Sequence, residues 1–218
     1  MLNHTVSGLL LDMDGTLVDS NALVEQIWRE FADVHGLDLT AILDYSHGRP
    51  SIDTVRRFLP DDEAEQWRWR DEVEAQGMAR IDGIVEVPGA AEFIRRATAS
   101  EIPFAVVTSA PRDLAVKRFG AAGVPFPELA VTADDITVGK PDPQPFALGA
   151  QLLRLPAAVC AAFEDSGAGL ASARGAGAVT VVVGGYAGPE AAGLERIRHW
   201  HNVEIEPVNG AFRLYESA

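Results

Sequence analysis

The chain has 218 residues, of which 47% are hydrophobic and 23% charged, an ordinary composition for a globular protein that argues against disorder. The 32 acidic residues outnumber the 18 basic ones and give a net charge of −14, which disfavours nucleic acids and anionic membranes as partners. A single cysteine, Cys160, excludes an internal disulfide, and without a signal-peptide pattern or a run of about 20 apolar residues we expect a cytoplasmic protein.

The first predicted element is a short buried strand over residues 6–12, with the sequence VSGLLLD. Residues 20–84 are then predicted to be entirely helical, because apolar residues recur there at helical spacing. The segment divides into three predicted helices, over residues 23–35, 51–59 and 61–78. Since Trp67 and Trp69 are two positions apart on the third helix, we expect at most one of them to face the core.

After residue 84 the pattern alternates between helices and short apolar strands. Helices are predicted over 89–100 and from residues 111, 145 and 167, and strands over 102–108, 129–132, 158–165 and 178–183. Asn209-Gly210 lies between two strand-like runs and indicates a closing hairpin. Such alternation is typical of a parallel sheet with helices on both faces. We therefore expect a doubly wound α/β core, residues 1–19 and 85–218, with residues 20–84 inserted as a helical domain after the first strand.

Polar side chains follow the predicted strands, at the edge of the sheet where open α/β folds form their sites. In chain order they are Asp12 and Asp14, Thr108 and Ser109, Lys140, and Glu164 and Asp165. Four carboxylates at one edge repel each other unless a cation lies between them. Mg²⁺ prefers oxygen ligands and also contacts phosphate, so we expect Mg²⁺ as the cofactor. Lys140, one of two lysines in the chain, would offset the carboxylates and hold a phosphoryl oxygen.

Four of these stretches carry a resemblance to a known family. DMDGT (12–16), VVTSA (106–110), GKPDPQPF (139–146) and FEDSGAG (163–169) occur in an order and spacing similar to the haloacid dehalogenase superfamily. The match is specifically to its phosphatase branch, in which a helical (C1-type) cap follows the first strand. The resemblance spans nearly the whole chain and implies a Rossmann-like core with an inserted all-helical cap.

The resemblance also implies roles for individual residues. Asp12 is similar to the nucleophile that becomes an aspartyl phosphate, and Asp14 to the acid that protonates the leaving alkoxide and then activates water as a base. Thr108 and Lys140 would hold the oxygens of the transferring group. The metal ligands would be the Asp12 carboxylate, the Asp14 backbone carbonyl, Asp165 and, directly or through water, Glu164.

The same motifs weigh against other activities of the superfamily. Dehalogenases lack an acid at the position of Asp14, and phosphonate-cleaving relatives use a cap lysine, which residues 20–84 do not contain. β-Phosphoglucomutase relatives have a histidine where this chain has Val24, so water is the expected acceptor, and the mutase reaction is the alternative. Two alternatives to an enzyme are a phosphoaspartate signalling receiver and a relative that only binds its ligand. By family resemblance, receivers are about half the length of this chain.

The stretch SHGRPSIDTVRRF in the predicted cap is similar to that of sugar-phosphate and glycerol-phosphate phosphatases. Arg49 lies just before a helix with Ser51 as its expected N-cap, where free backbone N–H groups would meet an anion or a hydroxyl-rich ligand. Gly48 permits close approach, and His47 and Ser109 complete the expected substrate-binding set. We therefore expect hydrolysis of a small hexose or polyol phosphate by a monomer or weak dimer, with this phosphorylated small molecule as the partner.

Overall fold

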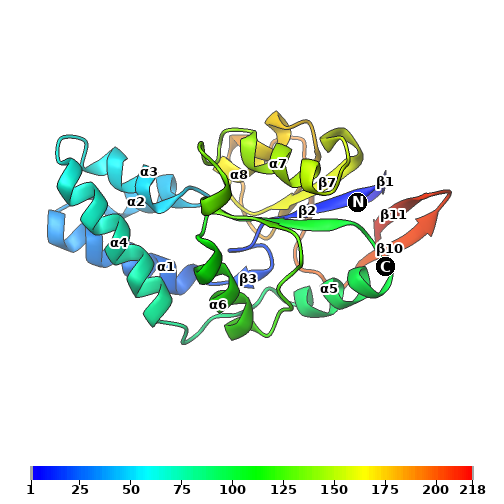
Figure 1. Ribbon diagram of the computed structural model, residues 1–218, viewed down its shortest axis with the longest axis horizontal. Coiled ribbons are helices and arrows are strands. Elements are labelled where there is room, and N and C mark those ends of the chain that lie inside the picture. Colours follow the sequence, from blue (N-terminus) through cyan, green and yellow to red (C-terminus); the bar gives the residue numbers. More distant parts are fainter. Residues whose placement is uncertain (1, 218) are drawn as a thin grey trace.

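The computed structural model describes residues 2–217 and contains a six-stranded parallel sheet with a helical unit at one end (Figure 1). In sheet order the strands are β6 (Ala130–Val131), β5 (Phe104–Val107), β2 (Gly8–Leu11), β7 (Cys160–Glu164), β8 (Val179–Val183) and β9 (Glu195–Ile197). Every neighbouring pair is parallel. The predicted parallel sheet is confirmed, and the short edge strand β9 extends it beyond the prediction.

Helices cover both faces of this sheet. Successive side chains of a strand point to opposite faces, so an entirely apolar strand makes both faces apolar and both are buried. In β2, Leu9 and Leu11 join the apolar cluster beneath one pair of helices, whereas Leu10 joins the cluster beneath the other pair. The pairs are α5 (Ala90–Ala99) with α6 (Arg112–Ala122), and α7 (Gln144–Leu152) with α8 (Gly167–Gly175). The predicted doubly wound architecture is confirmed.

In the sequence, four helices come between β3 (Val18–Asp19) and β4 (Val85–Glu86), two short strands that pair with each other as an antiparallel ribbon. They are α1 (Asn21–His35), α2 (Leu39–Ser46), α3 (Ser51–Phe58) and α4 (Glu63–Ala79). They pack around an apolar cluster of their own that includes Phe31 and Trp69. Trp69 is 4% exposed and Trp67 is 41% exposed, so one tryptophan of the pair faces the core as predicted. The division of the chain at residues 20 and 84 stays a prediction, which this separate packing supports.

Some elements differ from the prediction. Helix α2 is not one of the three helices predicted within residues 20–84; it begins after Asp38, whose side chain caps the backbone N–H of Thr40 at 2.9 Å. The strand predicted over 6–12 is two strands, β1 (Asn3–Val6) and β2, because the backbone N–H of Ser7 turns to bond Val159 instead. Strand β1 pairs with the hairpin β10 (Val203–Val208) and β11 (Ala211–Glu216), whose predicted Asn209-Gly210 turn is confirmed.

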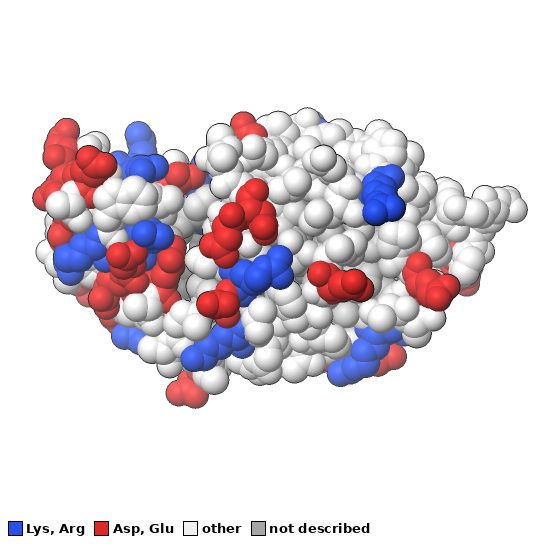
Figure 2. Space-filling model, in the orientation of Figure 1, with Lys and Arg blue, Asp and Glu red and all other residues white. Residues whose placement is uncertain are grey.

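The view in Figure 2 shows acidic and basic side chains interleaved over the helices α1–α4, while much of the core on this face is uncharged. On this face the two signs alternate over the helices. None of the helices within residues 2–217 combines the length and hydropathy of a membrane span.

Candidate active site

The centre of the site is a buried lysine that joins the ends of three strands. The Lys140 side chain is fully buried, and its Nζ donates to Asp12 Oδ1 at 2.6 Å, to Glu164 Oε1 at 2.7 Å and to the Val107 carbonyl at 2.9 Å. These partners lie at the carboxyl ends of β2, β7 and β5. The ammonium therefore has a partner for each of its three N–H groups and holds the Asp12 carboxylate in place.

Burial dominates the electrostatics of this cluster. It raises the pKa of Asp12 to about 8, with the Glu164 carboxylate adding to the effect and Lys140 opposing it. The pKa of Asp165 is also well above its usual range, first because of burial and then because of Glu164 and Asp12. For Lys140, burial acts to lower the pKa, but the carboxylates of Asp12 and Glu164 outweigh it and raise the pKa. The single positive charge of Lys140 does not balance the negative charges that Asp12, Glu164 and Asp165 carry when ionised, so the site favours binding of a further cation.

The acidic residues are arranged in a way that fits a divalent metal. Asp12, Glu164 and Asp165 each offer an oxygen, and these oxygens lie within 4.8 Å of one another. Glu164 is already engaged, because its Oε2 accepts from the backbone N–H of Asp165 and from both the N–H and the hydroxyl of Ser166. Within the described residues, the one hydrogen bond to the Asp165 carboxylate is a long contact of 3.5 Å from Thr16. Asp12 and Asp165 are thus better placed as direct ligands than Glu164.

Two motif glycines make room for these carboxylates. A Cβ at Gly15 would lie 1.9 Å from Asp165 Oδ2, and the φ of Gly15 is +82°, in the left-handed region that favours glycine. A Cβ at Gly169 would lie 1.7 Å from Glu164 Oε1. The glycines of DMDGT and FEDSGAG are therefore required by close packing against the acids.

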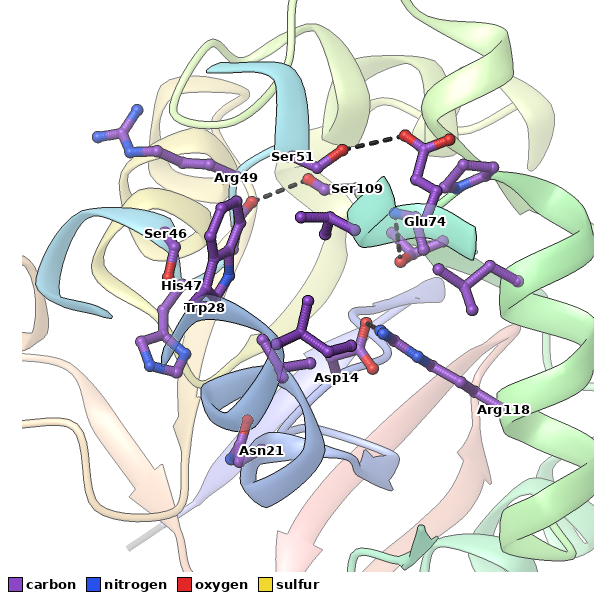
Figure 3. A pocket seen from close by; sticks show the side chains of 18 of the residues that line it. Asp14, Asn21, Trp28, Ser46, His47, Arg49, Ser51, Glu74, Ser109 and Arg118 are labelled. Carbon is purple, nitrogen blue, oxygen red and sulfur yellow. Dashed lines mark hydrogen bonds and ion pairs between the residues drawn. The ribbon is translucent and has the colours of Figure 1, made fainter. Parts of the chain in front are cut away.

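Asp14 lies beside this cluster and is held by both of its carboxylate oxygens. Ser20 Oγ donates to Oδ1 at 2.5 Å, and Arg118 Nη1 donates to Oδ2 at 2.8 Å. Figure 3 shows the Arg118 side chain reaching from the side of the pocket to Asp14. Arg118 was not predicted as a site residue. The signal that was available is a charged residue on the apolar face of α6, where its neighbours Leu114 and Ala115 are buried.

Thr108, which is predicted to hold a phosphoryl oxygen, and Ser109, which is predicted to bind substrate, lie where the strand β5 ends. Thr108 is buried, and its Oγ1 accepts from the backbone N–H of Ala110 at 3.1 Å. Ser109 Oγ donates to the carbonyl of Gly48 at 2.8 Å, so this hydroxyl connects the core to the loop between α2 and α3. A Cβ at Gly48 would lie 2.1 Å from Ser166 Oγ. The loop therefore contacts the core at two points, and Ser109 is engaged with it.

The loop residues differ in how they face the pocket. His47 and Arg49 both line the cavity, but the Arg49 guanidinium extends away from Asp14 (Figure 3). It stacks over the Tyr45 ring at 4.3 Å. The predicted N-cap at Ser51 is wrong: Pro50 holds the N-cap position and Ser51 is the first helical residue. The Ser51 hydroxyl instead donates to Glu74 Oε1 at 3.0 Å, which brings an unpredicted carboxylate to the pocket.

The cavity enclosed by these residues lies between the helices α1–α4 and the sheet edge and has a volume of about 110 Å³. One part of its wall is apolar, and the rest is polar. The apolar part includes Val24, Ile27, Trp28 and Val73, and the polar part includes Asp12, Asp14, Asn21, Glu74, Arg118 and Asp165. A small molecule with both carbon and hydroxyl surface suits this lining.

Residues 6–177 match the profile of the haloacid dehalogenase-like hydrolases. The chain belongs to this family. It is 38% identical over 180 residues to hexitol phosphatase A of Escherichia coli, covering 81% of this chain and 82% of the relative. It is 32% identical over 186 residues to glycerol-1-phosphate phosphohydrolase 2 of Saccharomyces cerevisiae, covering 81% and 74%.

Solved structures agree with this assignment. A hydrolase from Pseudomonas syringae is 25% identical and superposes with a TM-score of 0.77, covering 87% of this chain and 92% of that one. A β-phosphoglucomutase from Clostridium difficile, 22% identical, also reaches a TM-score of 0.77, covering 89% and 91%, and shows the shared fold. The expectation of a haloacid dehalogenase-like hydrolase with a Rossmann-like core is confirmed.

In this haloacid dehalogenase-like hydrolase, the raised pKa of Asp12 predicts a pH-dependent stability. Between its usual pKa of 3.8 and about 8, the folded chain keeps a proton on Asp12 that the unfolded chain has lost, so the free energy of unfolding falls as pH rises. An Asp12→Asn variant has no titratable group at this position and lacks this pH-dependent change in the free energy of unfolding. Urea unfolding in EDTA is expected to show its stability advantage over the wild type growing from pH 4 to pH 8. Parallel pH curves would contradict a proton held by Asp12.

Proposed function

We propose that the protein is a Mg²⁺-dependent phosphomonoesterase that hydrolyses a small sugar or polyol phosphate through an aspartyl-phosphate intermediate. The observation that carries the proposal is the buried contact of Lys140 with Asp12 and Glu164, beside Asp14 and Asp165 at one sheet edge. Curated relatives named as phosphatases, at 38% and 32% identity, support the same reaction class.

Asp12 and Asp14 divide the reaction between them. The Asp12 carboxylate attacks phosphorus, the bond from phosphorus to the alcohol oxygen breaks, and Asp14 donates a proton to that oxygen as it leaves. Asp14 then takes a proton from the water that attacks the phosphoaspartate, which releases phosphate and restores Asp12. Lys140 keeps Asp12 oriented, and Thr108, which lines the cavity, would hold an oxygen of the transferring group.

The donor set fits Mg²⁺, which supplies charge neutralisation between the carboxylates and a bound phosphoryl group. Asp12, Asp165 and the Asp14 backbone carbonyl would hold the ion. Glu164 would reach it through water, because both of its oxygens already accept hydrogen bonds. Glu164 thus acts mainly by positioning Lys140.

The helices α1–α4 act as the cap that selects the substrate. Their loop at His47–Arg49 contacts the core through Ser109, and their helix α4 brings Glu74 to the cavity. Glu74 is an acceptor for a substrate hydroxyl, with Ser51 holding its other side. A cavity of about 110 Å³ with this mixed lining suits a short polyol or sugar more than a large apolar alcohol.

Phosphate release from a panel of hexose, pentose and polyol phosphates, with p-nitrophenyl phosphate included, tests the proposal. Release is expected for a few polyol or sugar phosphates in Mg²⁺ and should be lost in EDTA, because the acidic cluster then lacks its cation. Restoring Mg²⁺ in excess is the matched control. Formation of an isomerised sugar phosphate without free phosphate would contradict hydrolysis and favour the mutase reaction. That reaction is not expected, because this chain has Val24 where mutase relatives have a histidine.

A further inference from the structure

Arg118 is a charged residue in a position that packing alone does not explain. It lies on the buried face of α6 with Leu114, Ala115 and Phe119, and it is 6% exposed. Its Nη1 donates to Asp14 Oδ2 at 2.8 Å, whereas its Nε has no hydrogen-bond partner among residues 2–217. Burying a guanidinium with an unsatisfied donor is unfavourable, and an apolar side chain would fill the same space.

The surroundings of Arg118 hold its guanidinium in one place. Helix α4 of the cap packs on α6 at Gly77, where a Cβ would lie 3.4 Å from Arg118 Nη2 and 3.3 Å from a methyl group of Leu114. The guanidinium is therefore confined between α4 and Asp14. Ser20 donates to the other oxygen of Asp14, so two donors on opposite sides define the plane of its carboxyl group.

We propose that Arg118 is a positioning residue that orients the Asp14 carboxyl group toward the oxygen of the leaving alcohol. The inference rests on the proposed function, because it assigns Arg118 to the proton transfer that accompanies cleavage of the bond between phosphorus and oxygen. The proton moves from Asp14 to the alcohol oxygen, which keeps the electron pair of the broken bond. A displaced carboxyl group would transfer this proton poorly.

A residue that orients Asp14 can be distinguished from a purely structural residue by comparing substrates with different leaving groups. An alkyl alcohol is a poor leaving group and requires the proton, whereas p-nitrophenolate leaves without one. The value of kcat/KM reports the steps up to release of the alcohol, before water attacks the phosphoaspartate that both substrates share. Loss of Arg118 should therefore affect kcat/KM for alkyl phosphates and spare kcat/KM for p-nitrophenyl phosphate.

The experiment compares Arg118→Met and Arg118→Lys with the wild type, using glycerol 1-phosphate, sorbitol 6-phosphate and p-nitrophenyl phosphate in Mg²⁺. For the better alkyl substrate we expect Arg118→Met to lower kcat/KM by about 10- to 100-fold, and p-nitrophenyl phosphate to change by less than about 3-fold. Arg118→Lys should recover part of the loss, since it keeps a donor. Lys117→Met, one position away on α6 and half-buried, is the matched control and should leave both values unchanged.

Three results would overturn the inference or its basis. An equal loss for alkyl and aryl substrates, in a variant that melts cooperatively, would mean that Arg118 supports binding or folding instead. Unchanged kcat/KM for both substrates would mean that Asp14 needs no orientation from Arg118. If the wild type released phosphate from none of these three substrates and from no other member of the hexose, pentose and polyol phosphate panel, the proposed function itself would fail, and the variants would not be the cause.

Discussion

Replacing Asp12 with asparagine is expected to lower phosphate release by about 10⁴-fold or more while the protein stays folded. An amide is not a nucleophile toward phosphorus, so the aspartyl-phosphate cannot form. Its oxygen can still accept the hydrogen bond that Lys140 Nζ now donates to Asp12 at 2.6 Å. Because burial disfavours the charged carboxylate at this position, the neutral amide should leave the melting temperature unchanged or higher.

The measurement is phosphate release at saturating substrate and Mg²⁺, together with thermal melting. Asp71→Asn makes the same chemical change at an aspartate of α4 whose side chain is 68% exposed, and it should retain wild-type activity. Activity of more than a few per cent in Asp12→Asn would show that another group attacks phosphorus. A cooperative melt is needed in both variants, since it separates a chemical loss from unfolding.

The sheet and its functional edge follow from local patterns in the sequence. The run Leu9-Leu10-Leu11 is apolar without alternation, which predicts a strand buried on both faces, and its leucines do divide between the two apolar clusters. Residues after such strands meet at one edge whatever the length of chain between them. Asp12, Lys140 and Glu164 could therefore be placed together although Lys140 is 128 residues from Asp12 in the sequence.

Contacts made by helix faces and by the cap loop were not predictable in the same way. The pairing of Arg118 with Asp14 depends on how α6 is rotated and on where α4 packs, and neither has a local signal in the sequence. The hydrogen bond from Ser109 to the Gly48 carbonyl likewise depends on the placement of the cap loop. Spacing alone made Ser51 an N-cap, but Pro50 occupies that position. Residues on strand ends were thus easier to place than residues on helix faces.

Replacing Lys140 with methionine is expected to abolish turnover and also to destabilise the fold, by about 3–5 kcal/mol. The methionine would leave the Glu164 carboxylate, and Asp12 when it is ionised, without the ammonium that bonds both, and the Asp12 and Glu164 side chains are 7% and 0% exposed. The free energy of unfolding from urea denaturation in EDTA measures this loss. Lys117→Met, which removes a half-buried lysine of α6, is the control and should change stability by less than about 1 kcal/mol.

A second substitution separates the lost charge balance from the lost packing. In Lys140→Met/Glu164→Gln, the amide oxygen of the glutamine can still accept from Asp165 and Ser166, as Glu164 Oε2 does, and its amide N–H can face Asp12. The double variant should therefore regain stability relative to Lys140→Met, while activity stays lost because no ammonium orients Asp12. If the double variant were no more stable than Lys140→Met, the uncompensated carboxylate would not be the cause of the destabilisation, and the ionic role assigned to Lys140 would be wrong.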